Sequence, residues 1–220
     1  MTILLAGCGD LGTEAALRFA ALGHRVVGWR RSPGNLPAAI EGVAADLSAA
    51  GLPPVPADTS AVVVAVAADA STEEAYRAAY VQGLSNVLNA LERDGVAPRR
   101  VLFVSSTAVY GDAGGVVAMN TIRVADVAAA AIVHLATMDA EPAGTYIGVD
   151  NDPADLGSVL RFLADALDLT PPPVGDAGPA RAGNKRCSNS LLRSTGFEFS
   201  FPTFREGYRD ILAGNGVRHP

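Results

Sequence analysis

The sequence predicts an α/β fold in which a doubly wound parallel sheet is followed by a small C-terminal lobe. Apolar runs typical of buried strands alternate along the chain with segments of helical spacing. A glycine-rich turn joins the first of these strands to the first helix. The 220 residues suffice for one sizeable α/β domain with a small appendage.

Five strands are expected in the first half of the chain, at residues 2–7, 24–29, 41–46, 59–68 and 99–106. A helix over residues 10–23 follows from the spacing of its apolar side chains and ends at Gly23. A long helix over 71–94 begins with a capping box of Ser71 and Glu74. Strands that alternate with helices indicate a parallel sheet with right-handed crossovers.

The pattern changes after residue 120. We expect a helix over 121–137, a strand over 144–150 and a helix over 152–169. A connector rich in proline and glycine follows at about residues 170–184. The remaining residues predict two short helices and one strand of alternating pattern.

Composition narrows the class of protein. The formal net charge of −6, from 17 basic and 23 acidic residues, argues against nucleic acid and anionic membranes as partners. Every long apolar run is interrupted, so no transmembrane helix is expected, and the N-terminus lacks the basic start of a signal peptide. Cys8 and Cys187 predict reduced thiols in the cytoplasm, and three scattered histidines predict no metal site.

The glycine-rich turn GCGDLG carries the first functional signal. Gly7, Gly9 and Gly12 have the spacing G-x-G-x-x-G between a strand and a helix. In that context the glycines allow a tight turn, a close approach to a pyrophosphate and close packing of helix on strand. We therefore expect a Rossmann-type, dinucleotide-binding domain over residues 1–150 and a substrate-side lobe over 151–220. A plain glycine turn is the alternative, and Cys8 is expected to shape the loop.

The end of the second strand indicates which dinucleotide is bound. Trp29, Arg30, Arg31 and Ser32 stand where an NAD site would place a carboxylate. Two guanidiniums and a hydroxyl suit the 2′-phosphate of NADP, so NADP is expected, with NAD possible and a solvated basic turn as the alternative. The full set of expected cofactor residues is Gly7, Gly9, Asp10, Leu11, Gly12, Trp29, Arg30, Arg31, Ser32, Asp46, Leu47, Ala65, Ala67, Ala68 and Ser105.

With these residues placed, the chain resembles the extended short-chain dehydrogenase/reductase superfamily, within the NAD(P)-dependent epimerase/dehydratase group. The stretches that carry the resemblance are GCGDLG, YVQGLSNVLNAL, VLFVSSTAVYG and IRVADVAAAAIVHL. The C-terminal lobe is similar to that of an atypical branch close to bacterial sugar-nucleotide epimerase-like proteins. The resemblance implies a homodimer through the helix over 71–94. It also implies a small polar substrate of the nucleotide-sugar class.

The resemblance further implies that Ser106, with Thr107, orients a substrate oxygen and that a tyrosine paired with a lysine four residues later transfers a proton. That pair is missing, because the only lysine is Lys185 and no tyrosine precedes it by four residues. Tyr110 is the minority candidate for the acid/base. A basic pair at Lys185 and Arg186 either meets a substrate phosphate or is a solvated turn.

The missing pair leaves two explanations and two functions open. The sequence runs from the fifth strand into the next helix with little chain between them, and Gly115–Val116 marks the junction. Either a segment of the molecule is absent from the sequence there, or the protein lacks it. The first favours an NAD(P)-dependent oxidoreductase, epimerase or dehydratase; the second favours a non-catalytic NADP-binding sensor or regulatory protein.

Overall fold

The computed structural model describes residues 1–106, 124–142, 144–152, 154–173, 187–216 and 218–219. The chain divides into two compact units. One unit comprises Met1–Val104, Ala128–Ala140 and Arg218–Pro220, and the other comprises Ser105–Val127 and Glu141–Val217.

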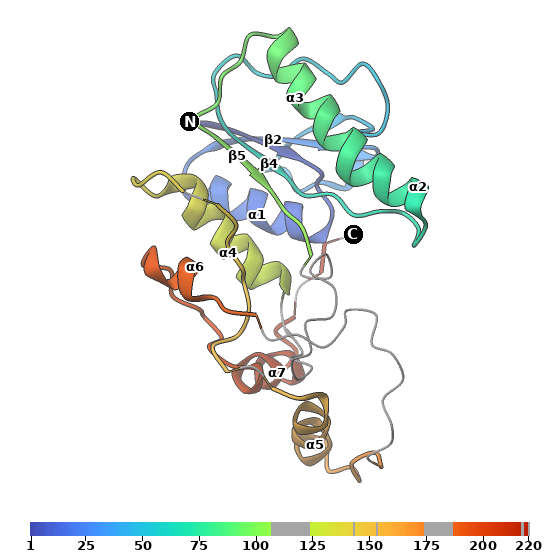
Figure 1. Ribbon diagram of the computed structural model, residues 1–220, viewed down its shortest axis with the longest axis vertical. Helices are drawn as coiled ribbons and strands as arrows, with labels where there is room; N and C mark the ends of the chain where they lie inside the picture. Colours follow the sequence, from blue (N-terminus) through green and yellow to red (C-terminus); the bar gives the residue numbers. More distant parts are fainter. Residues whose placement is uncertain (107–123, 143, 153, 174–186, 217, 220) are drawn as a thin grey trace. The chain divides into compact units, whose positions relative to one another are not determined.

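A five-stranded parallel sheet forms the centre of the first unit, in the order β3-β2-β1-β4-β5 (Figure 1). The strands are β1 (Thr2–Ala6), β2 (Arg25–Arg30), β3 (Glu41–Ala44), β4 (Thr59–Val64) and β5 (Arg100–Phe103). Four fall within the segments that the sequence predicts, and β2 extends one residue beyond its predicted end at residue 29. The predicted α/β class with a parallel sheet is confirmed.

Helices cover the sheet on both faces (Figure 1). The helices α1 (Asp10–Ala21) and α4 (Val124–Thr137) pack on the face that carries Ile3 and Leu5. The helix α3 (Gly83–Arg93) packs on the opposite face. Successive residues of β1 point to opposite faces, and all five are buried, so the apolar run at residues 2–6 serves two cores at once.

The expected long helix is formed by three consecutive elements: α2 (Glu73–Tyr76), the π-helical turn η2 (Arg77–Gln82) and α3. The predicted capping box at Ser71 is wrong by one residue, because the Thr72 hydroxyl accepts the hydrogen bond from the Ala75 N–H at 3.2 Å. The predicted end at residue 94 is confirmed, because α3 ends at Arg93 and Gly95 follows with a left-handed backbone, at a φ of 64°.

Tyr76 and Tyr80 lie on one stripe of this helix, as their spacing predicts. Their rings stack with centroids 5.8 Å apart, and Tyr80 meets Phe103 of β5 edge to face at 6.3 Å. Tyr80 therefore packs this helix against β5. The homodimer expected through this helix stays a prediction.

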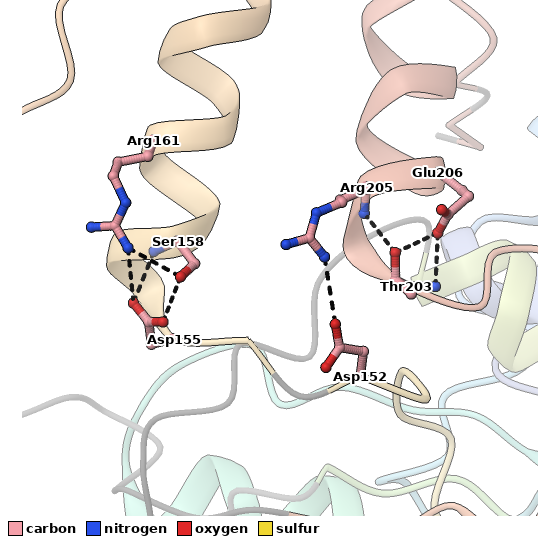
Figure 2. A network of polar contacts seen from close by, with 7 residues as sticks. All are labelled: Asp152, Asp155, Ser158, Arg161, Thr203, Arg205 and Glu206. Carbon is pink, nitrogen blue, oxygen red and sulfur yellow. Dashed lines mark hydrogen bonds and ion pairs between the residues drawn. The ribbon is translucent and has the colours of Figure 1, made fainter.

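The second unit contains the helices α5 (Leu156–Ala166), α6 (Ser190–Ser194) and α7 (Phe204–Leu212), and side chains cap the starts of α5 and α7. Figure 2 shows two of these caps. Asp155 accepts hydrogen bonds from the Ser158 N–H and hydroxyl at the start of α5. Thr203 and Glu206 form a capping box at the start of α7. Arg205 pairs with Asp152 at 3.4 Å and so ties α7 to the segment that precedes α5.

Two expected strands do not form in the second unit. Described residues 144–150 form no strand, and one of their backbone groups has a side-chain partner: the Asn189 amide donates to the Val149 carbonyl at 2.8 Å. The alternating pattern at 197–201 also gives no strand. There Phe197 and Phe199 pack edge to face with centroids 5.0 Å apart.

A short helix, η1 (Pro33–Asn35), follows β2 in the first unit. In the described part of the chain no helix is both long enough and apolar enough to cross a membrane.

Arg100 joins the edge strand to the end of α4. Its side chain is buried, and its guanidinium donates hydrogen bonds to the carbonyl oxygens of Leu135, Met138 and Ala140 at 2.5–2.9 Å. These carbonyls lie at the C-terminal end of α4, where a helix leaves acceptors unpaired and favours a positive charge. Arg100 therefore holds β5 and α4 together.

We expect Arg100→Met to lower the free energy of unfolding by about 2–3 kcal/mol, because it leaves three carbonyls without their donor. Urea unfolding followed by circular dichroism measures this loss. Arg99→Met is the matched control, since Arg99 is exposed, and it should cost less than about 1 kcal/mol. Equal losses in the two variants would contradict the assigned role of Arg100.

Candidate functional site

The candidate site lies at the carboxyl ends of the central strands. The chain passes from β1 outward to β2 and β3 and then returns to β4 on the other side of β1. In open α/β sheets, ligands bind outside the carboxyl ends of the strands at such a reversal. Ala6 of β1 is level with Trp29 of β2 and Val64 of β4, so the three strands end together around the glycine loop, residues 7–12.

The glycine loop is held by contacts that leave no room for side chains at two positions. The N–H groups of Gly7 and Cys8 donate to the Trp29 carbonyl at 3.0 and 3.2 Å. Gly7 has a φ of 105°, and a Cβ there would lie 2.3 Å from the Ala65 carbonyl oxygen. A Cβ on Gly12 would lie 2.0 Å from the Gly7 carbonyl oxygen. Both glycines are therefore required by the fold itself.

Gly9 differs from the other two glycines. It is exposed, its backbone angles are φ −78° and ψ −160°, and no described atom lies within 4 Å of a Cβ placed there. Any residue can adopt this extended backbone, so the chain itself does not require glycine at position 9. A glycine that leaves open space over a loop suits a ligand that approaches the backbone closely.

The first turn of α1 opens at this space. Gly9 is the N-cap of α1, and among the described residues no side chain caps it. The N-terminus of a helix presents unpaired N–H groups and a partial positive charge, which together favour a phosphate. Leu11 is half-buried and packs against the core below the loop. The loop therefore combines an open backbone with donors that suit an anion.

Asp10, one of the expected cofactor residues, contacts the C-terminal tail. Its carboxylate accepts a hydrogen bond from the His219 backbone N–H at 2.9 Å. The His219 ring lies 2.9 Å from the carboxylate of Glu14 one turn later. Burial alone would raise the pKa of Glu14, but hydrogen bonds from His219 and Arg18 lower it overall. The tail is thus anchored to the first two turns of α1.

The expected basic end of β2 carries acidic partners. Arg31 is exposed and forms two hydrogen bonds with Asp69, which follows β4. Asp46, after β3, is exposed and accepts hydrogen bonds from the N–H and hydroxyl of Ser48. Ser32 is exposed next to Arg31, and Arg30 is half-buried. The sequence predicted the two arginines and Asp46 here but not Asp69.

Two expected cofactor residues have buried side chains. Trp29 is fully buried and Leu47 is 9% exposed, both in the core beneath α3. Neither side chain is accessible to a cofactor, so a contact of these two residues with one would have to use the backbone. The alternation of β2 turns Trp29 into the core, and its part in the site is the carbonyl that holds the loop. Ala65 and Ala68 are half-buried and Ala67 is exposed, so the segment after β4 is lined by small side chains.

Cys8 is a core residue within the loop. It is 1% exposed, and burial raises the pKa of its thiol to about 12, although Arg30 acts in the opposite direction. A nucleophilic cysteine needs a stabilised thiolate, which this environment does not supply. The expectation that Cys8 shapes the loop agrees with this burial.

The expected catalytic residues are only partly described. Ser105 and Ser106 are exposed and follow Val104, whose N–H continues the β4–β5 ladder to the Val64 carbonyl. They belong to the second compact unit. Thr107, Tyr110 and the junction at 115–116 lie outside the described residues, as do Lys185 and Arg186.

Comparisons with known proteins agree with this geometry. The model of the family "NAD dependent epimerase/dehydratase family" matches residues 3–123. A solved structure of a proposed NAD-dependent epimerase/dehydratase from Methylobacillus flagellatus is 28% identical, with a TM-score of 0.73, and the match covers 97% of this chain and 98% of that chain. No curated protein matches the chain.

Two more distant structures share the fold. MoeE5, in complex with UDP-glucuronic acid and NAD, is 16% identical with a TM-score of 0.69, and the match covers 95% of this chain and 97% of that chain. The human epimerase family protein SDR39U1 (isoform 2), with NADPH, is 17% identical with a TM-score of 0.70, and the match covers 97% and 99% of the two chains. At these identities the likeness supports the fold.

The glycine contacts predict that two similar substitutions change the free energy of unfolding by very different amounts. Gly12→Ala should lower the free energy of unfolding by about 3 kcal/mol or more, because its Cβ meets backbone at 2.0 Å. Gly9→Ala should stay within about 1 kcal/mol of the unsubstituted protein, because its Cβ enters open space. Thermal and urea unfolding measure both, and a large loss in Gly9→Ala would show that the fold needs that glycine.

The buried Cys8 predicts a thiol that resists labelling. In a Cys187→Ser variant, whose single thiol is Cys8, a thiol reagent should react with the folded protein at pH 8 far more slowly than with the urea-unfolded protein. The reaction is followed by absorbance. Equal rates in the folded and unfolded states would refute the buried, protonated thiol.

Proposed function

Because the chain belongs to the NAD dependent epimerase/dehydratase family, we propose that it is an enzyme that binds a nicotinamide dinucleotide on its glycine loop. The reaction class is hydride transfer at a carbinol or carbonyl carbon, as in an oxidoreductase, epimerase or dehydratase. The observation that carries the proposal is the start of α1, where no described side chain caps the helix and no described atom lies within 4 Å of a Cβ placed on Gly9. Gly7 and Gly12 shape the loop, and Gly9 leaves room for the ligand.

The described residues fit such a cofactor at several points. The backbone N–H groups at the start of α1 would hold the pyrophosphate. Arg30, Arg31 and Ser32 would lie near the adenosine ribose, with NADP preferred over NAD, and Asp46 would lie near the adenine. The small side chains of residues 65–68 would let the cofactor pass close to the backbone. A bound nicotinamide would supply the carbon that accepts and returns a hydride.

The proposed substrate is a small polar molecule, with a nucleotide sugar as the leading class. The support is the family and a fold shared with MoeE5, a protein whose structure contains UDP-glucuronic acid. Ser106 would orient the reacting oxygen, since it follows the fifth strand and is exposed. Residues 151–220 are proposed to supply contacts to the rest of the substrate.

A second function, a non-catalytic NADP-binding sensor or regulatory protein, is favoured by one observation. The chain has a single lysine, Lys185, and no tyrosine lies four residues before it. A phenol needs a nearby cation to exchange protons near neutral pH, and a sequence without that pair lacks the usual source of one. Both functions require the same cofactor site, and they differ in turnover.

Calorimetric titration with NADP⁺ and NAD⁺ tests the cofactor site shared by both functions. We expect NADP⁺ to bind more tightly than NAD⁺, and Gly9→Val to weaken both at least about tenfold by filling the space the ligand needs. Gly148→Val is the matched control, because a Cβ there also meets no described atom within 4 Å but lies in the second unit. Absence of heat with either dinucleotide would refute both functions.

The same protein then separates the two functions. Conversion of members of a panel of carbonyl substrates and nucleotide sugars supports the enzyme. Net reduction is followed by loss of NADPH absorbance, whereas epimerisation or dehydration, which returns the hydride to the substrate, is followed by chromatography of the sugar product. Binding of NADPH without turnover over the whole panel supports the sensor.

A further inference from the structure

The ion pair between Arg31 and Asp69 has the geometry with which arginine binds phosphate. Nη1 and Nη2 of Arg31 donate in parallel to the two carboxylate oxygens of Asp69, at 2.7 and 2.8 Å. A guanidinium presents the same pair of donors to a carboxylate and to a phosphate. The donors expected to bind a 2′-phosphate are therefore occupied by a carboxylate of the same chain.

The pair spans the site from one side to the other. Arg31 follows β2 directly, Asp69 lies in the segment after β4, and β1 with its glycine loop runs between these two strands. Neighbouring strands are about 4.8 Å apart, so β2 and β4 are separated by roughly 10 Å. The two side chains close this distance beyond the end of β1. They thus join the segments on either side of the glycine loop.

A second carboxylate acts on the same guanidinium. Hydrogen bonds from Ser48 lower the pKa of Asp46, Arg31 lowers it further, and Asp69 acts in the opposite direction. The hydrogen bond from Arg31 lowers the pKa of Asp69. Both carboxylates are therefore ionised at neutral pH, and Arg31 lies in the field of two negative charges. A phosphate dianion that reaches Arg31 also meets that field.

We propose that Asp69 determines the dinucleotide preference of this site by holding Arg31. A 2′-phosphate has to displace the Asp69 carboxylate from the guanidinium, whereas a 2′-hydroxyl leaves the pair in place. The pair is exposed, with side-chain exposures of 63% and 68%, so a phosphate displaces it readily but leaves the freed carboxylate nearby. Asp69 therefore lowers the preference for NADP that Arg31 alone would give. This inference rests on the proposed function, that is, on a nicotinamide dinucleotide bound at the glycine loop.

The test compares the affinities of NADP⁺ and NAD⁺ for Asp69→Asn, measured by calorimetric titration. We expect the affinity ratio of NADP⁺ to NAD⁺ to rise about tenfold, because the substitution frees Arg31 and removes one negative charge. The increase should be smaller at 0.5 M salt, where exposed charges are screened. Asp58→Asn is the matched control. It also removes an exposed carboxylate next to an arginine, but at the opposite end of β4, and it should leave the ratio unchanged.

The Asp69→Asn substitution in an Arg31→Ala background distinguishes two actions of Asp69: holding the Arg31 guanidinium, and repelling the 2′-phosphate directly. If Asp69 acts through Arg31, Asp69→Asn should raise the ratio much less in this background than in the unsubstituted chain. An equal rise in both backgrounds, or an unchanged ratio while both dinucleotides still bind, would overturn the inference and leave the proposed function intact. A protein that binds neither dinucleotide would overturn both.

Discussion

The contact between Gly12 and the Gly7 carbonyl brings the start of α1 against the end of β1, and the site is built on that contact. A single methyl group at either glycine would overlap backbone of the loop or of the segment after β4. Because Gly7 and Cys8 also donate to the Trp29 carbonyl, the loop is tied to β2 as well as to β4. The glycine loop is thus the point where three strands and one helix are fixed together, while Gly9 remains open to a ligand.

Both positively and negatively charged groups lie around the glycine loop. The helix start favours an anion, but Asp10 in the first turn is engaged by the C-terminal tail, and Arg31 is paired with Asp69. The proposed site therefore places donors that suit a phosphate next to acidic residues. A balance of this kind suits selective recognition of one dinucleotide more than simple attraction of anions.

The sequence predicts the first unit well, because its strands are continuous apolar runs bounded by glycine and its helices have regular spacing. It predicts less of the second unit. Residues 144–150 have the composition of a strand, but Asn189, about 40 positions later, satisfies a backbone carbonyl there. The alternation at 197–201 reflects aromatic packing between Phe197 and Phe199.

Asp69 was missed because its partner Arg31 is 38 positions away and only the strand order brings them together. The burial of the Trp29 side chain was not predicted, because its place near the end of a strand does not tell which face of the sheet it takes.

The most direct test of the account is hydrogen–deuterium exchange of the glycine loop with and without NADP⁺. The account predicts that the backbone amides at the open start of α1, residues 9–11, exchange more slowly when the dinucleotide is present, because the pyrophosphate accepts their hydrogen bonds. The amides of Gly7 and Cys8 should change little, since Trp29 already accepts from them. Unchanged exchange at residues 9–11 with saturating NADP⁺ and NAD⁺ would contradict the claim that this loop holds a dinucleotide.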